Sequence, residues 1–232
     1  MKMKSILKVN IMGKYKQTEP SEIPEGWNIL HLDDVSELVK DVYRPNEQDN
    51  MHYVGLEHID QQNLTLNSIG NSSEIKSNKF HFKRGDILFG KLRPYFRKVY
   101  RSTFDGVCST DIWVVRSKNG TDQGFLFYFL ANKDFVDLAS SGSSGTRMPR
   151  ADWDYLKETT WSIPSIGEQR AIAKILSDLD EKIELNRQMN KTKPSNQLPR
   201  RFLNNGLWSS SFLDMKKRNL LTGCLMDGTL VN

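Results

Sequence analysis

The sequence predicts a mixed α/β domain followed by one long helix. Between residues 21 and 164, short apolar runs of strand-like composition are separated by turn signals and accompanied by one helix-length apolar run. Between residues 165 and 191 the apolar residues recur instead at alternating steps of four and three, the heptad spacing of a coiled-coil-forming helix. The 232 residues also leave room for a basic N-terminal arm, residues 1–20, and an irregular basic tail, residues 192–232.

The predicted domain begins with a turn, a strand and a short helix. Pro24-Glu-Gly26 is a turn signal, and the run 27–32 that follows it has the composition of a strand. Asp33 or Asp34 is expected to cap a short helix over residues 33–39, because a carboxylate before the first turn accepts hydrogen bonds from its amides.

Strands dominate the middle of the domain. Alternating apolar and polar residues predict a strand over 52–59, whereas residues 67–78 are rich in Ser and Asn and are expected to form a loop. Gly85-Asp86 makes a turn into a buried strand over 86–89. Two further strands are predicted at 97–100 and 111–115.

The last part of the domain is expected to contain a buried helix and a flexible loop. Residues 123–131 include the run Phe-Leu-Phe-Tyr-Phe-Leu, which predicts a helix that is apolar on all sides. Residues 140–146 are almost entirely Ser and Gly, a composition typical of a flexible loop. The segments 153–155 and 158–163 then return the chain to the domain.

The long helix has a defined start and a narrow apolar stripe. Ser165 can cap it, and Glu168, three residues later, completes a capping box. The stripe consists of Ile172, Leu176, Leu179 and Ile183 and continues as Asn186 and Asn190. Polar residues in such a seam weaken it but specify register and partner number. We expect the stripe to pair with a helix of another chain, and packing on its own domain is the alternative.

Basic residues are concentrated in one segment of the domain. Between residues 79 and 101, Asp86 is the single acid among eight basic residues: Lys79, Lys83, Arg84, Lys91, Arg93, Arg97, Lys98 and Arg101. A concentration of this kind can bind a phosphate backbone, although a solvated basic face is the simpler interpretation.

Two short stretches are candidates for contact with DNA. Gly90 and Pro94 are expected to shape a turn from which basic and aromatic side chains project, and a Gly/Ser-rich loop is followed by two further arginines. Arginine can bind guanine or phosphate, and tyrosine can pack on sugar or base. The alternatives place Tyr95 and Phe96 in the core and make the Gly/Ser loop a linker. The predicted DNA contacts are Lys91, Arg93, Tyr95, Arg97, Lys98, Arg147 and Arg150.

Several classes of activity lack their usual sequence signals. There is no P-loop, and an amino-methyltransferase would need a glycine-rich cofactor turn and an Asn/Asp-Pro-Pro-aromatic motif, neither of which occurs. Asp180-Glu-Lys182 lies on the long helix as a solvated face, and the spacing of His52, His58 and Cys108 fits no common metal site. No apolar run reaches the length of a membrane span, and the N-terminus lacks a signal-peptide core, so the expected compartment is the cytoplasm.

Four stretches together resemble the specificity (S) subunit of type I restriction-modification systems. The most specific one combines a proline, the triplet Glu-Gln-Arg and an apolar heptad that ends in Leu-Asp. The four stretches are Ile23–Trp27, Gly85–Phe89, Gly145–Met148 with Trp153 shortly after, and Ile163–Asp180.

The resemblance implies a non-catalytic, DNA-binding recognition subunit. A full-length S subunit carries two target-recognition domains, each reading one half of a split double-stranded target, and two long antiparallel helices between them. These helices space the domains and dock methyltransferase (M) subunits, which use S-adenosylmethionine, and a motor-nuclease (R) subunit joins for cleavage. The chain itself would then hold no cofactor. The rival hypothesis is a protein-interaction module whose helix docks a partner and whose basic face is incidental.

One domain and one helix make this chain look like a half-sized S subunit. Two copies paired through the helix, as a homodimer, would restore the usual layout. A helix from residue 166 to 190 would be about 37 Å long, which is close to the roughly 34–36 Å that separates half-sites read by two-fold DNA-binding proteins. A symmetric dimer would favour a palindromic split target.

Overall fold

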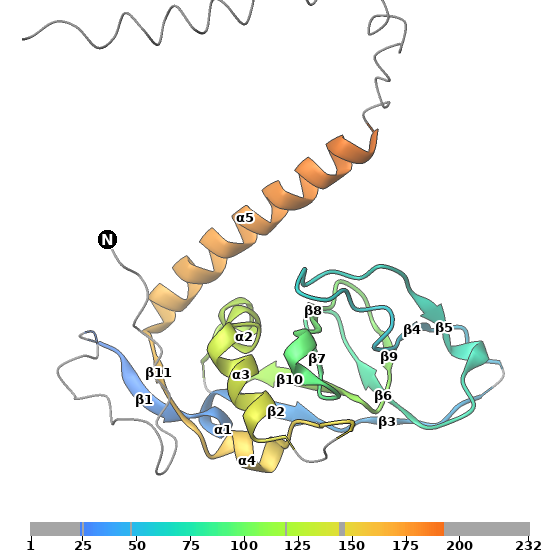
Figure 1. Cartoon of the computed structure of the whole chain (residues 1–232), viewed down its shortest axis with the longest axis horizontal. Helices are drawn as coiled ribbons and strands as arrows, with labels where there is room; N and C mark the ends of the chain where they lie inside the picture. Colours follow the sequence, from blue (N-terminus) through green and yellow to red (C-terminus); the bar gives the residue numbers. More distant parts are fainter. Residues whose placement is uncertain (1–23, 25, 47, 119, 144–146, 193–232) are drawn as a thin grey trace, which may run out of the picture. The chain divides into compact units, whose positions relative to one another are not determined.

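A computed structural model describes residues 24, 26–46, 48–118, 120–143 and 147–192 (Figure 1). The expected N-terminal arm and almost all of the expected tail lie outside these residues. Among the described residues, those up to Glu181 form one compact unit, and residues 182–192 belong to a second unit. The first unit contains the α/β domain that the sequence predicts.

A four-stranded antiparallel sheet forms the centre of this domain, in the order β2-β10-β7-β8. Its strands are β2 (Ser36–Val39), β7 (Ile87–Gly90), β8 (Val99–Arg101) and β10 (Ile112–Ser117). The predicted strands at 86–89, 97–100 and 111–115 are therefore confirmed to within two residues. Strands β7 and β10 read as continuous apolar runs because both faces of the sheet are covered.

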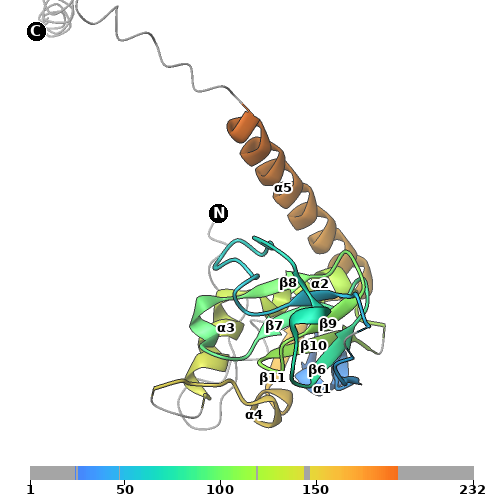
Figure 2. The same cartoon turned by 90° about the vertical axis from the view of Figure 1, so that its right-hand side faces the viewer.

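Successive side chains of these two strands enter two different cores. Ile87, Phe89, Trp113 and Val115 belong to a larger cluster that the helices complete. Leu88, Ile112 and Val114 belong to a second cluster. Side chains of a strand alternate between its faces, so the sheet separates the two cores. Helix α3 and strands β6 and β9 accordingly lie on opposite sides of β7 and β10 (Figures 1 and 2).

A second sheet of five strands, in the order β3-β6-β9-β4-β5, contributes the rest of the second cluster. Only β4 and β9 pair in parallel. The strands are β3 (Val42–Tyr43), β4 (His52–Val54), β5 (Gly70–Asn71), β6 (Lys79–Phe82) and β9 (Gly106–Cys108). Strand β4 is shorter than the predicted strand 52–59, because the chain turns at Gly55, whose amide donates to His58 Nδ1 at 3.0 Å.

Helices complete the larger cluster. The predicted buried helix is confirmed as α2 (Gln123–Leu130), capped by Asp122, whose side chain accepts from Phe125 N at 2.9 Å. Helix α3 (Lys133–Ser141) and the short α4 (Trp153–Lys157) follow it. The chain then returns through β11 (Thr160–Ile163), which pairs with β1 (Asn28–His31), the predicted first strand.

Several predicted elements differ from the structure. The expected loop over 67–78 contains β5 and a 3₁₀ turn, Ser72–Glu74, because Gly70 and Asn71 pair with β4. Residues 33–39 do not form one helix: a single turn, α1 (Leu32–Val35), is followed by β2, because residues 36–39 pair with the central strand β10. The loop expected over 140–146 is wrong at its start: Ser140 and Ser141 belong to α3, and their hydroxyls donate to the helix carbonyls of Val136 and Leu138 at 2.7 and 2.9 Å. Residues 144–146 of that loop lie outside the described residues. Tertiary packing overrides composition at each of these places.

Helix α5 (Ile166–Thr192) begins at the predicted capping box. Glu168 Oε2 accepts from Ser165 N at 3.1 Å and from Ser165 Oγ at 2.8 Å, and Glu168 N donates to Ser165 Oγ at 3.5 Å. The buried Gln169 accepts from Asp122 N and donates to Pro164 O, each at 2.9 Å. These bonds join the helix start to the start of α2.

The first turns of α5 pack on the domain, and the apolar stripe is increasingly exposed along the helix. Ile172 contacts the larger cluster, and Tyr128 donates a hydrogen bond to Asp180 at 2.9 Å. Leu179 and Ile183, by contrast, are 50% and 47% exposed. The beginning of the stripe, at Ile172, therefore packs on the chain's own domain, as the alternative interpretation predicts. Pairing of the remainder with another helix stays a prediction.

Candidate nucleic-acid interface

The connection between β7 and β8 forms a basic turn, residues 91–98. Gly90 N donates to Lys98 O at 2.8 Å and closes its base. Within it, Pro94–Phe96 make one 3₁₀ turn, and the residues on either side, Arg93 and Arg97, adopt left-handed φ angles of 51° and 52°. Such angles are uncommon outside glycine, so the surrounding contacts must impose them. The expected turn shaped by Gly90 and Pro94 is present.

The second candidate stretch lies directly beside this turn. Residues 147–151, which we call the arginine segment, are joined to it by main-chain bonds: Arg93 N donates to Pro149 O at 2.8 Å, and Ala151 N donates to Lys91 O at 2.9 Å. An antiparallel bridge pairs Leu92 with Arg150. Two stretches that the sequence suggested separately therefore form one surface.

Several predicted contact residues are open to solvent on this surface. Tyr95 is 49% exposed and packs edge to face on Phe96 with 4.7 Å between ring centroids, so the alternative that places Tyr95 in the core is wrong. Arg147 and Arg150 are exposed, and Lys91 and Arg93 are partly exposed. Arg93 Nε is buried and has no hydrogen-bond partner in the structure.

Arg97 and Lys98 are instead held by the domain. Arg97 Nε donates to Ala131 O at 2.5 Å, and Lys98 Nζ donates to Leu56 O at 2.5 Å. Burial lowers the pKa of Arg97, although Asp180 nearby opposes that shift. No sequence signal distinguishes these two residues from their neighbours, because their partners are main-chain carbonyls distant in the chain.

A shallow pocket of about 320 Å³ adjoins the two segments. Lys91 and Arg150 belong to its lining, together with Trp113 and Trp153, whose rings meet edge to face at 5.3 Å. Acidic groups moderate the positive charge here: Asp111 Oδ1 accepts from Arg150 Nε at 3.1 Å. The surface is basic overall but not uniformly so.

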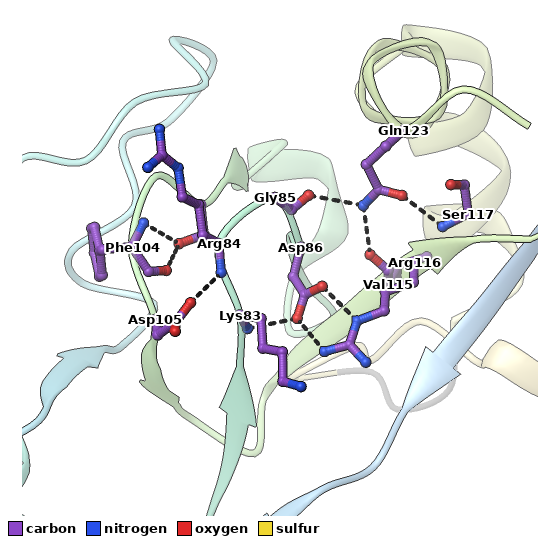
Figure 3. Close-up of polar contacts among 11 residues, drawn as sticks. Lys83, Arg84, Gly85, Asp86, Phe104, Asp105, Val115, Arg116, Ser117 and Gln123 are labelled. Carbon is purple, nitrogen blue, oxygen red and sulfur yellow. Dashed lines mark hydrogen bonds and ion pairs between the residues drawn. The ribbon is translucent and has the colours of Figure 1, made fainter.

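A buried ionic network anchors the opposite end of β7. Asp86, 3% exposed, accepts from Arg116 Nε at 2.6 Å and Nη2 at 2.8 Å and from Lys83 N at 2.7 Å (Figure 3). These hydrogen bonds raise the pKa of Arg116. Gln123 Nε2 donates to Gly85 O at 2.9 Å, and Gln123 Oε1 accepts from Ser117 N at 2.6 Å. These bonds attach the start of α2 to the start of β7 and the end of β10.

The part of the chain that the structure describes contains no cluster of three or more His, Cys, Asp or Glu residues that could hold a metal ion. Cys108 is buried in the second cluster, and burial raises the pKa of its thiol to about 12. No described helix is both long and apolar enough to cross a membrane.

The family model for the type I restriction modification DNA specificity domain matches residues 24–192, from the turn before β1 to the end of α5. The chain belongs to this family. The match covers the capping box, the basic turn and the arginine segment together. The resemblance seen in the sequence is thus confirmed, as is the expectation of a non-catalytic recognition component, because members of the family are specificity subunits.

Relatives and solved structures agree with this assignment. The chain is 29% identical over 172 residues to the type I restriction enzyme EcoDI specificity subunit of Escherichia coli, covering 73% of this chain and 38% of that protein. It is 25% identical over 210 residues to the HindI specificity subunit of Haemophilus influenzae, covering 87% of this chain and 44% of that protein.

The fold matches that of a solved specificity subunit. The HsdS subunit from Thermoanaerobacter tengcongensis superposes with a TM-score of 0.60 at 25% identity, covering 73% of this chain and 46% of that one. The mixed α/β fold is therefore confirmed. The chain spans less than half the length of each of these three proteins.

Proposed function

We propose that this chain is the DNA sequence-specificity subunit of a type I restriction-modification complex and reads one half of a split target. The observation that carries the proposal is the family match over residues 24–192, combined with the basic turn and arginine segment that adjoin within it. Its partners would be double-stranded DNA, M subunits that bind S-adenosylmethionine, and an R subunit. The rival protein-interaction module is not favoured by the family match.

The contacts of the side chains divide the predicted DNA-binding residues into two groups. We propose that Lys91, Arg93, Tyr95, Arg147 and Arg150 contact DNA, since their side chains are exposed or partly exposed on one surface. Arg97 and Lys98 shape that surface, because each donates to a main-chain carbonyl of a neighbouring segment. Cationic groups provide affinity through phosphates, and those that reach base edges provide specificity.

The apolar stripe of α5 would pair two copies of the chain. Exposure of Leu179 and Ile183 supports this part of the proposal, because burying one such side chain contributes about 1.5–3 kcal/mol. Asn186 and Asn190 would set the register of the pair. The paired helices would space the two recognition domains and dock the M subunits. Changing Leu179 and Ile183 to Asp should convert a dimer to a monomer in light scattering, and a wild-type chain that is monomeric alone and on DNA would contradict the pairing.

The decisive experiment is co-purification of the chain with its M subunit, followed by mapping of methylated sites. We expect a split recognition sequence, palindromic if the chain pairs with itself, and DNA binding that weakens steeply with salt. Selection from random DNA that returns no preferred sequence would contradict the proposal and favour the protein-interaction module. The same preparation reports partner, target and half-site spacing.

A further inference from the structure

We infer that the loop of residues 60–66, which we call the amide loop, is a second base-reading element that acts beside the basic turn. This inference rests on the proposed function. The loop lies between β4 and β5, and three consecutive side chains at its tip, Gln61, Gln62 and Asn63, are exposed amides. Nothing in the sequence pattern singled out this loop, because it carries no basic residue.

Hydrogen bonds close the amide loop at its base. Asp60 N donates to Thr65 O at 2.9 Å, and an antiparallel bridge pairs Ile59 with Leu66. The Asp60 carboxylate accepts from Gln61 N at 2.9 Å and from Asn63 Nδ2 at 2.8 Å. These bonds define the path of the main chain at the tip and fix the side-chain amide of Asn63.

Apolar side chains anchor the loop to both cores. Leu64 packs against the larger cluster, and Leu66 packs against the second cluster. Ile59 is 1% exposed within that second cluster. The loop is thus attached on both sides of the central sheet, while its polar tip remains exposed.

The amide loop and the basic turn share an uncommon backbone feature. Within the described residues, the non-glycine residues with positive φ are Gln62 (69°), Leu64 (59°), Arg93 (51°) and Arg97 (52°). All four belong to these two segments. Such conformations are strained, persist where packing imposes them, and are concentrated at functional sites.

Direct contacts join the basic turn to Leu56, in the stretch that leads from β4 into the amide loop. Lys98, the last residue of the basic turn, donates from Nζ to Leu56 O at 2.5 Å. A Cβ on Gly90 would lie only 2.8 Å from Leu56 Cδ2 and 3.2 Å from Lys98 Cβ, so glycine permits the close approach. Figures 1 and 2 both show the segment after β4 passing beside β8, which directly follows the basic turn. The chain therefore enters the amide loop beside the basic turn, and on this inference a duplex held by the turn would meet the amides at the loop's tip.

The chemistry of the tip suits base reading rather than phosphate binding. A glutamine amide offers one acceptor and a donor group, which match the N6 and N7 positions of adenine in the major groove. An uncharged amide releases no counterions from DNA. We therefore expect Gln61 and Gln62 to determine preference for one A·T pair without contributing to the salt dependence of binding.

The test is selection from random DNA by the full chain in complex with its M subunit, compared between wild type and a Gln61→Ala/Gln62→Gly double variant. Glycine at 62 accommodates the positive φ. Gln48→Ala, which alters an exposed amide outside the loop, is the matched control. We expect the double variant to lose preference at one A·T position by about 5- to 100-fold, with the other positions and the salt slope unchanged.

Two results would overturn the inference. A double variant that keeps every wild-type base preference, or that weakens all sequences equally, would exclude base reading by the loop while leaving the proposed function intact. A wild-type complex without any sequence preference would overturn the proposed function and this inference together. A Gln62→Asn variant that keeps part of the preference lost in the double variant would support the amide chemistry. Matched thermal unfolding of all variants would verify that they are folded.

Discussion

The two ends of strand β7 use the same kind of side chain in opposite ways. At its start, the guanidinium of Arg116 is bound by both oxygens of the buried Asp86 carboxylate. Beyond its end, the side chain of Arg93 has a buried Nε without any hydrogen-bond partner in the structure, and Arg147 lies exposed nearby. At the start of β7, which we call the closed end, a carboxylate neutralises the arginine, whereas the surface beyond the other end of β7, which we call the open end, carries exposed basic side chains. The difference teaches that arginines at the two ends of one strand can serve the fold at one end and a ligand at the other.

The largest expected effect on stability comes from breaking the ion pair between Asp86 and Arg116 at the closed end. Asp86→Asn should lower the free energy of unfolding by about 3 kcal/mol, since it leaves Arg116 without its counter-charge in a partly buried site. Denaturant unfolding measures this change. The double variant Asp86→Asn/Arg116→Gln should lose less than the sum of the single variants. A loss below about 0.5 kcal/mol for Asp86→Asn would show that the network does not stabilise this end.

Arg97→Ala should produce the next largest effect and should behave like a change at the closed end. Loss of the hydrogen bond to Ala131 O is expected to lower the free energy of unfolding by about 1–2 kcal/mol, below the usual range for a charged bond because the group is partly solvated. The salt slope of DNA binding should not change. A reduced slope with unchanged stability would instead assign Arg97 to phosphate contact.

Changes at the open end should affect DNA binding and leave stability within about 0.5 kcal/mol. Lys91→Ala and Arg147→Ala should each weaken binding to all sequences and reduce the salt slope by about one. Lys133→Ala is the control, because it removes an exposed lysine that pairs with Asp137 on α3. Equal effects of all three variants would mean that the surface acts only through net charge.

The smallest effect is expected at Asp111, the acid beside the open end. Asp111→Asn removes the partner of the half-exposed Arg150, and such pairs contribute about 0–1 kcal/mol to stability. Binding to DNA should become slightly tighter and more sensitive to salt, because Arg150 is released and a negative charge is lost. Filter binding at several salt concentrations would detect the change, and weaker binding would show that Asp111 orients Arg150 for contact.

Local chemistry was predictable from the sequence, and long-range pairing was not. The capping box of Ser165 and Glu168 and the apolar helix α2 depend on near neighbours, and both are present as expected. Strand β2 was missed because its partner, β10, lies some 75 residues further along the chain, as the pairing of Val39 with Val114 shows. Whether a polar group is bonded within the fold or left exposed depends on partners distant in the sequence as well.

The same reason explains which parts of the candidate interface were found. Basic composition identified the turn and the arginine segment, but no local signal indicated that Leu92 would pair with Arg150. The amide loop begins directly after the strand predicted at 52–59, and the sequence predicts no role for it, because neutral amides carry no compositional signal of nucleic-acid binding. The structure relates it to the basic turn through the residues that precede it, where Lys98 contacts Leu56.

The main-chain bonds that join the basic turn to the arginine segment have an evolutionary consequence. Arg93 N, Pro149 O, Lys91 O and Ala151 N hold the two segments together through groups that most amino acids share. The exposed side chains on this framework can therefore be exchanged without rebuilding it. Lineages could acquire new target preferences by replacing a few surface residues, while the scaffold and its partners stay the same.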